Sequence, residues 1–332
     1  MKKLEEYLRG NWGLVLVLAT LLVFVVLKAL LAGKQGDWLN VVFGALIVVE
    51  IAYLVFTEVR EGVHKNGWSH EIVDTLLAIG IALAVWFGAQ WVLGTSTPVS
   101  AVVSCSMLDN LQRGDFVVVQ GGAVTAMTAQ LSDIEYYQLV HGPFVVTDAS
   151  GSGRSLNMPL GNYCQCNFGE DFCTQFLKNP TAYVETAGAA TFHYKKCGKN
   201  YATGKQSTAV CLDYFDIKGQ RFRMGNTSND IIVYTPRPGE LYYYMLGGGD
   251  IVHRTAAKLN VSGKMYYLTG GDNNPMLDSQ YYDCSSGVGN APPSTDNTKG
   301  HVIGRVPYLG YLRLFIAGYW GEDEQCGWVL KR

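Results

Sequence analysis

The chain has 332 residues, of which 48% are hydrophobic and 16% are charged, and its mean hydropathy is +0.08. This composition is too apolar for an ordinary soluble enzyme. The formal net charge is -2 and neither end carries a long run of like charges, which excludes the usual electrostatic pattern of a nucleic-acid-binding protein.

The apolar excess lies in three runs near the N-terminus, at about residues 12–31, 38–56 and 72–93. Each run is close to the roughly 20 residues that cross a bilayer core as a helix. The first run is too long for a cleavable signal peptide, lacks a small-residue cleavage site and precedes two further runs. We therefore predict a membrane domain over residues 1–94 with three transmembrane helices.

Basic residues near the ends of these runs predict their direction. Two groups, one before the first run and one between the second and third, should face the same side: Lys2, Lys3, Arg9, Arg60 and Lys65. Lys28 and Lys34 lie on the other side. Because cytoplasmic loops carry the excess of Lys and Arg, we expect a multi-pass protein of the cell membrane with a cytoplasmic N-terminus. Residues from about 95 onward should then be extracytoplasmic.

After residue 95 the chain changes to short β-branched and aromatic runs separated by Gly and Asp turns, at residues 115–120, 230–234, 251–255, 265–269, 302–306 and 311–316. This spacing is typical of a mainly β domain. We assign it residues 95–120 and 227–316, followed by a C-terminal tail at 317–332. Within it, Leu241–Leu246 is an aromatic and apolar cluster, which predicts either contact with the membrane interface or packing in the core.

Residues 121–226 hold five of the eight cysteines and show no clear periodicity. We interpret them as a cysteine-rich insertion. Disulfides are expected for cysteines outside the cytoplasm. A zinc site is the alternative. However, one residue separates Cys164 from Cys166, whereas about two to four residues usually separate paired zinc ligands.

Two hydroxyls, those of Ser104 and Ser106, lie just beyond the third apolar run. In an extended segment they share one face and Cys105 takes the other. A serine needs a base that accepts its proton, and a third group must hold that base. We expect His253 to be the base, because imidazole titrates near neutrality. Lys258 is the rival, and its odd separation from His253 places it on the opposite face of a continuing strand.

Several short segments together resemble the type I signal peptidases, specifically the archaeal and endoplasmic-reticulum branch. The similarity covers residues 95–120 and 229–316, in the form of a Ser-Cys-Ser-Met segment at 104–107, Arg-Gly-Asp at 113–115, Asp-Ile-Val-His-Arg at 250–254, Gly-Asp-Asn-Asn at 271–274 with Asp278, and residues 302–311. The Gly-Asp-Asn-Asn block and the His-Arg pair are the most specific of these segments.

The resemblance implies a serine endopeptidase in which Ser106 is the nucleophile. The Ser104 hydroxyl and the Ser106 backbone N–H would form the oxyanion hole. The bacterial branch has a Lys-Arg pair where this chain has His253 and Arg254, which implies the His-dependent branch and a supporting role for Arg254.

Two aspartates follow the His-Arg pair. The resemblance implies that Asp278 is the acid of the triad and that Asp272 supports the site, and the reverse assignment stays open at this point. No cofactor or metal is implied.

The implied substrates are precursor proteins that carry N-terminal signal peptides, cut at the extracytoplasmic membrane face. The implied partners are these precursors, the lipid bilayer and, as a further option, the secretion translocon, with no nucleic acid.

This sequence departs from the family pattern at two positions, where Cys105 replaces a Gly between the serines and Asp109 replaces a Pro. An acid near the site would raise the pKa of the histidine. These departures leave two alternatives open: a catalytically silent membrane receptor of the same fold, and a membrane protease dedicated to a narrow set of surface proteins.

Overall fold

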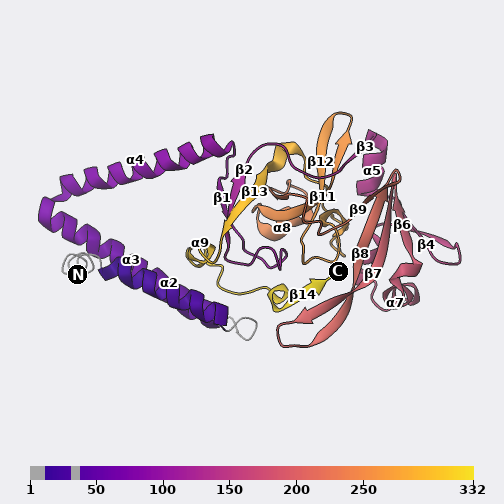
Figure 1. Ribbon diagram of the computed structural model, residues 1–332, viewed down its shortest axis with the longest axis horizontal. Coiled ribbons are helices and arrows are strands. Elements are labelled where there is room, and N and C mark those ends of the chain that lie inside the picture. The colour runs from indigo at the N-terminus through magenta and orange to yellow at the C-terminus, as the bar shows by residue number, and fades with distance from the viewer. Residues whose placement is uncertain (1–11, 31–37) are drawn as a thin grey trace.

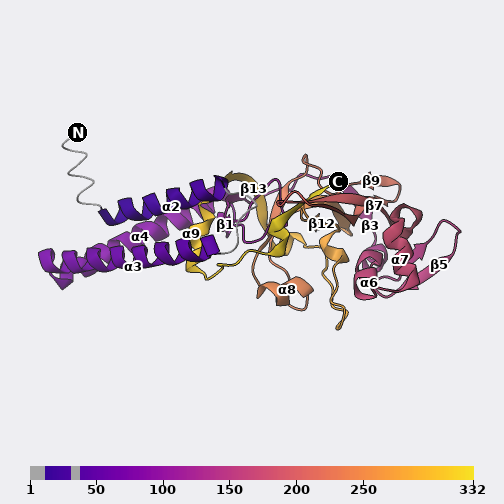
Figure 2. The same ribbon diagram turned by 90° about the horizontal axis from the view of Figure 1, so that it is seen from below.

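The computed structural model describes residues 12–30 and 38–332. Three long helices form one end of the molecule, and two mainly antiparallel sheets form the other (Figures 1 and 2). The expectation of a mainly β domain that follows N-terminal helices is confirmed.

The N-terminal helices are α2 (Trp12–Leu30), α3 (Trp38–Asn66) and α4 (Trp68–Leu93). In the described part of the chain, α3 over Trp38–Lys65 and α4 are long and apolar enough to cross a membrane, whereas the apolar part of α2, Trp12–Lys28, is shorter. Residue 31, the last of the first predicted span, lies outside the described residues. The structure therefore supports two of the three predicted spans.

Helix α2 packs on α3, and a later helix, α9 (Gly310–Ile316), packs on both. Phe24 of α2 lies edge-on to Tyr311 and Phe315 of α9, with ring centroids 5.0 and 5.4 Å apart. We predicted a strand over 311–316, and this is wrong. The buried positions 311, 314 and 315 follow helical spacing, and the aromatic β-formers among them misled the sequence analysis.

The first sheet has the strand order β1-β2-β13-β10-β11-β12, with β3 paired in parallel to β11. Its strands are β1 (Val99–Ala101), β2 (Phe116–Gln120), β3 (Thr128–Leu131), β10 (Ile231–Tyr234), β11 (Ile251–Val261), β12 (Lys264–Gly270) and β13 (Thr298–Val306). Strand β3 falls within the range expected for the insertion, yet it extends the first sheet.

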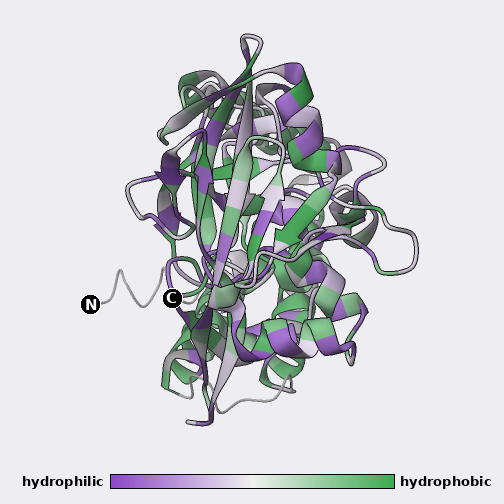
Figure 3. Ribbon diagram, turned by 90° about the vertical axis from the view of Figure 1, so that its right-hand side faces the viewer, coloured by the Kyte–Doolittle hydropathy of each residue, from purple (hydrophilic) through white to green (hydrophobic). Residues whose placement is uncertain are grey.

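The second sheet has the order β5-β4-β6-β7-β8-β9, with β14 paired to β7. Its strands are β4 (Phe144–Thr147), β5 (Gly153–Leu156), β6 (Val184–Ala187), β7 (Ala190–Tyr201), β8 (Gln206–Ile217), β9 (Gln220–Phe222) and β14 (Trp328–Lys331). Figure 3 shows hydrophilic and hydrophobic positions interleaved along the strands, as expected for strands with one buried face. The tail therefore contributes a strand to the sheet that the insertion forms.

Short helices connect these strands. They are α5 (Asp133–His141), α6 (Leu160–Cys166), α7 (Asp171–Lys178), α8 (Leu241–Leu246), and the 3-10 turns η1 (Pro180–Ala182), η2 (Asp278–Gln280), η3 (Thr295–Asn297) and η4 (Glu324–Gly327). Helix α8 projects from the body of the sheets (Figure 2), and none of its residues is buried. A core strand is therefore wrong for the aromatic cluster, although Tyr242 packs against a buried cluster that includes Tyr234 and Tyr267. Membrane contact of the exposed residues stays a prediction.

One core cluster joins the two sheets. It contains Leu259 and Leu268 of the first sheet together with Phe192 and Phe215 of the second, all at most 3% exposed. Burial of apolar surface between the sheets stabilises both of them.

All eight cysteines are paired in disulfides, as the sequence predicted. The pairs are Cys105–Cys326, Cys164–Cys173, Cys166–Cys284 and Cys197–Cys211. A disulfide sulfur offers no thiolate to a metal, so the alternative of a zinc site in the insertion is excluded. The Cys166–Cys284 bridge links the insertion, and the Cys105–Cys326 bridge links the tail, to the part of the chain that forms the first sheet.

Glu185 of β6 is a completely buried acid. Its Oε2 accepts hydrogen bonds from the Leu160 backbone N–H, at 3.1 Å, and from the Tyr194 hydroxyl. Its Oε1 has no partner within the described part of the chain. Burial raises the pKa of the Glu185 carboxyl from 4.5 to about 7.

We expect this acid to make stability fall as pH rises. Between pH 4.5 and about 7 the folded protein binds at Glu185 a proton that the unfolded chain has lost, so the contribution of Glu185 to the free energy of unfolding is highest below pH 4.5 and declines up to about pH 7. Glu185→Gln should therefore raise the free energy of unfolding at pH 8 by at most about 3 kcal/mol. The gain at pH 5 should be smaller. Thermal unfolding of the full chain in detergent measures this. The partly exposed Glu170→Gln is the control, and an equal gain at both pH values would contradict the prediction.

Candidate active site

Three side chains from distant segments form a hydrogen-bonded series. Ser106 lies in the loop between β1 and β2, His253 on β11, and Asp278 at the start of η2. Ser106 Oγ lies 2.9 Å from His253 Nε2, and His253 Nδ1 lies 2.7 Å from Asp278 Oδ2. All three residues are at most 7% exposed, so the series is shielded from bulk water.

The surroundings of Asp278 keep it ionised. Burial acts to raise the pKa of its carboxyl, but the His253 ring and the Tyr234 hydroxyl, 3.0 Å away, lower it below its ordinary value. The Tyr242 hydroxyl lies 3.3 Å from the other oxygen. Because a carboxylate can only accept, Nδ1 of His253 donates to it, and in the tautomer with its proton on Nδ1 the ring accepts from the Ser106 hydroxyl through Nε2. This is the polarity that a general base requires.

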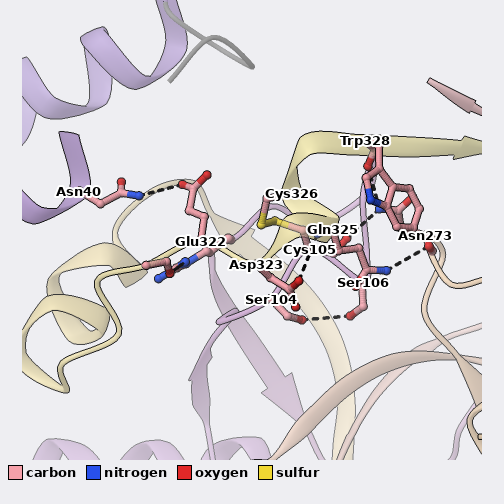
Figure 4. The surroundings of a disulfide bond; sticks show 12 residues. Asn40, Ser104, Cys105, Ser106, Asn273, Glu322, Asp323, Gln325, Cys326 and Trp328 are labelled. Carbon is pink, nitrogen blue, oxygen red and sulfur yellow. Dashed lines mark hydrogen bonds between the residues drawn. A yellow bond between two sulfur atoms is a disulfide. The ribbon is translucent and has the colours of Figure 1, made fainter. Parts of the chain in front are cut away.

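The serines occupy a turn, and the expected extended segment is not formed. The Leu108 N–H donates to the Cys105 carbonyl at 3.4 Å. Even so, Ser104 Oγ lies 3.1 Å from Ser106 Oγ (Figure 4). The two hydroxyls therefore meet through the curvature of the turn, without the alternation of a strand.

The Gly-Asp-Asn-Asn block lies directly against this turn. The Asn273 backbone N–H donates to the Ser106 carbonyl at 2.7 Å. A Cβ on Gly271 would collide with the same carbonyl oxygen, so glycine is needed for this close approach.

The two aspartates have different partners. Asp272 accepts two hydrogen bonds from Arg254, both at 2.8 Å, and a third from the Asn110 amide at 2.7 Å. Asp272 therefore contacts Arg254 and not the histidine, which is held by Asp278. The sequence left open which aspartate pairs with His253, and in the structure Asp278 is hydrogen-bonded to it.

Lys258 Nζ donates to the Val124 carbonyl at 3.0 Å, whereas Ser106 Oγ is hydrogen-bonded to His253. The parity argument for its direction does not apply, because the register of β11 shifts between Thr255 and Ala257. Asp109 is exposed and lies 3.5 Å from Lys331, so its charge is directed to the surface.

Sequence reasoning missed the contribution of the C-terminal tail. Cys326 is bonded to Cys105, which lies between the two serines (Figure 4). The Asn273 amide donates to the Cys105 carbonyl at 3.1 Å and to the Trp328 carbonyl at 3.0 Å. The even number of cysteines, with one in a polar tail, was the signal available in the sequence.

A cavity of about 790 Å³ opens at the serine and the histidine. Its walls come from α8, from β7 and β8 of the second sheet, and from the tail, through residues that include Tyr242, Met245, Lys199, Ala209 and Trp328. No group of three or more His, Cys, Asp or Glu side chains able to hold a metal occurs among the described residues.

No protein-family model matches the chain. Over 81 residues, 24% of the chain, it is 32% identical to the signal peptidase complex catalytic subunit sec11 of Sclerotinia sclerotiorum. The chain spans 45% of the length of that relative. This similarity supports a relationship to the signal peptidases, and it does not distinguish their branches.

The buried pair between Asp272 and Arg254 should be important for stability. Asp272→Asn leaves the guanidinium buried without its charged partner, at side-chain exposures of 6% for both residues. We expect the free energy of unfolding to fall by about 3–5 kcal/mol. Chemical denaturation measures the loss. Asp109→Asn, which removes an exposed pair, should change stability by about 0.5 kcal/mol or less, and equal losses would contradict the prediction.

The bridge between Cys105 and Cys326 closes a separation of 221 residues. The double variant Cys105→Ser/Cys326→Ser should lose about 2–4 kcal/mol of stability, because the unfolded chain gains freedom. The matched variant Cys197→Ser/Cys211→Ser opens a separation of 14 residues and should lose less. Denaturation of both variants tests this, and a larger loss in the second would contradict it.

Proposed function

We propose that this protein is a membrane-bound signal peptidase, a serine endopeptidase that removes N-terminal signal peptides from exported precursors. The observation that carries the proposal is the continuous series from Ser106 Oγ through His253 to the Asp278 carboxylate, at 2.9 and 2.7 Å. The similarity to a sec11 catalytic subunit supports the same reaction class.

In the proposed mechanism, Ser106 Oγ attacks the carbonyl carbon of the scissile bond, and His253 Nε2 accepts the hydroxyl proton. Asp278 stabilises the imidazolium that forms. The Ser104 hydroxyl and the Ser106 backbone N–H donate to the oxyanion, an effect worth about 3–4 kcal/mol per donor. His253 then gives its proton to the leaving amine, and water attacks the acyl-enzyme with the same histidine as base.

The proposed location is the cell membrane, with the catalytic sheets on the extracytoplasmic side. Helix α4 ends at Leu93, and β1 begins at Val99, so a short linker separates a candidate span from the catalytic loop. None of the residues of α4 is buried, which suits a helix surrounded by lipid. Precursors and the bilayer are the proposed partners, with the translocon as a further one.

The walls of the cavity favour a second candidate, a protease with a narrow set of surface-protein substrates. Lys199 and Ala209 come from the insertion, and Trp328 comes from the tail. These elements would contact a substrate beyond the scissile bond and select among precursors. Comparison of secreted proteins in normal and depleted cells distinguishes general from restricted use.

The nucleophile is tested with a secreted precursor. Ser106→Ala, His253→Ala and Asp278→Ala should each lower kcat by about 10³-fold or more, because the triad acts as a unit. Ser104→Ala should cost about 10²-fold. The exposed Ser96→Ala is the control, and cleavage assays with purified full chain measure all five variants. Normal processing by Ser106→Ala would refute the proposed nucleophile.

A serine-reactive phosphonate separates the remaining alternatives in the same preparation. It should label the wild type and the double variant Cys105→Ser/Cys326→Ser, but not Ser106→Ala. A silent receptor would leave Ser106 unlabelled.

A further inference from the structure

Three buried polar side chains connect the second sheet to the turn that carries Asp278. Gln280 Nε2 donates to the Tyr194 hydroxyl oxygen at 2.8 Å, and the Tyr194 hydroxyl donates to Glu185 Oε2. Gln280, Tyr194 and Glu185 are 3%, 2% and 0% exposed. This polar series therefore crosses the core that the two sheets share.

Gln280 also closes the turn around Asp278. Its side-chain Oε1 accepts from the Leu277 N–H at 3.2 Å, and its backbone N–H donates to the Leu277 carbonyl at 3.0 Å. The amide group of Gln280 is thus used at both ends, once within the turn and once toward Tyr194. The turn is therefore hydrogen-bonded to a hydroxyl of the second sheet.

The series is costly to bury, and packing alone does not account for it. The Tyr194 ring packs edge-on against Phe176, with centroids 5.4 Å apart, and a phenylalanine would keep that contact. Burial of the Tyr194 hydroxyl and the Glu185 carboxyl is compensated only while each keeps its partner. Hydrogen bonds between buried groups of this kind favour one arrangement of the groups that they join.

We propose that Glu185, Tyr194 and Gln280 are positioning residues that hold residues 277–280 so that Asp278 orients the His253 ring. This inference rests on the proposed function, in which Asp278 is the acid of the triad. It gives the cysteine-rich insertion a role in catalysis, because Glu185 and Tyr194 lie on β6 and β7. Their side-chain hydrogen bonds join Glu185, Tyr194 and Gln280 to one another and to the Leu160 and Leu277 backbone, so in this proposal they act through Asp278.

Tyr194→Phe is the direct test, since it removes the hydroxyl and keeps the ring. We expect kcat to fall about tenfold while KM changes less than about twofold, because the loss affects the orientation of the base and not substrate binding. Tyr163→Phe is the matched control: its hydroxyl also bonds a carboxylate, Glu170 Oε1 at 3.1 Å, in the same part of the fold. An unchanged kcat in Tyr194→Phe would overturn the proposal.

Substitutions at Glu185 separate positioning from charge. Glu185→Gln keeps an oxygen that can accept from Tyr194 and should retain kcat, whereas Glu185→Leu should match Tyr194→Phe. Equal losses in both Glu185 variants would contradict a role in orienting Tyr194.

A double-mutant cycle distinguishes positioning from general structural damage. Once Asp278→Asn has removed the acid, Tyr194→Phe should lower the residual kcat no further. If the two losses multiply, Tyr194 acts by another route and the proposal is refuted.

A spectroscopic measurement separates failure of this inference from failure of the proposed function. The downfield proton resonance of the hydrogen bond between His253 Nδ1 and Asp278 should shift or broaden in Tyr194→Phe and not in Tyr163→Phe. Equal precursor cleavage by wild type and Ser106→Ala would refute the proposed function alone. An unperturbed resonance in Tyr194→Phe would refute the positioning role, whatever the protein cleaves.

Discussion

The hydrogen bonds of Asn273 are the constraint on which the rest of the site depends. This completely buried residue donates from its backbone to the Ser106 carbonyl and from its amide to the carbonyls of Cys105 and Trp328. Its Oδ1 accepts from the Leu330 N–H at 2.8 Å. One residue thereby fixes the turn that carries Ser106, the loop after β12 and the C-terminal strand relative to each other.

The tail extends this bracing to the helices. The Glu322 carboxylate accepts hydrogen bonds from Lys28 of α2 and from the Asn40 amide of α3. Burial acts to raise the pKa of this carboxyl, but Lys28 lowers it, and the pKa lies below its ordinary value. Arg113 donates to the Tyr319 and Gly321 carbonyls. A segment without regular periodicity in the sequence is therefore fixed at both ends by specific polar contacts.

The sequence predicted the elements whose signals are local. The strands around His253 and residues 230–234 are short alternating or β-branched runs, and they form β11 and β10. The prediction for residues 311–316 was wrong, because their aromatic composition favours a strand. Their apolar side chains have helical spacing and pack as a helix against α2 and α3. The partners of Asp272 and Asp278, the pairing of the cysteines and the place of β14 all depend on contacts between distant segments, which one sequence does not encode locally.

The common core of the two sheets limits how this architecture can be altered. Leu259 and Leu268 of the first sheet pack in the same cluster as Leu212 and Phe215 of the second. Deletion of residues 121–226 would expose those leucines to solvent. It would also remove Cys166, the disulfide partner of Cys284. The segment that interrupts the chain of the first sheet is thus an inseparable half of the fold, not a module that could be exchanged or deleted.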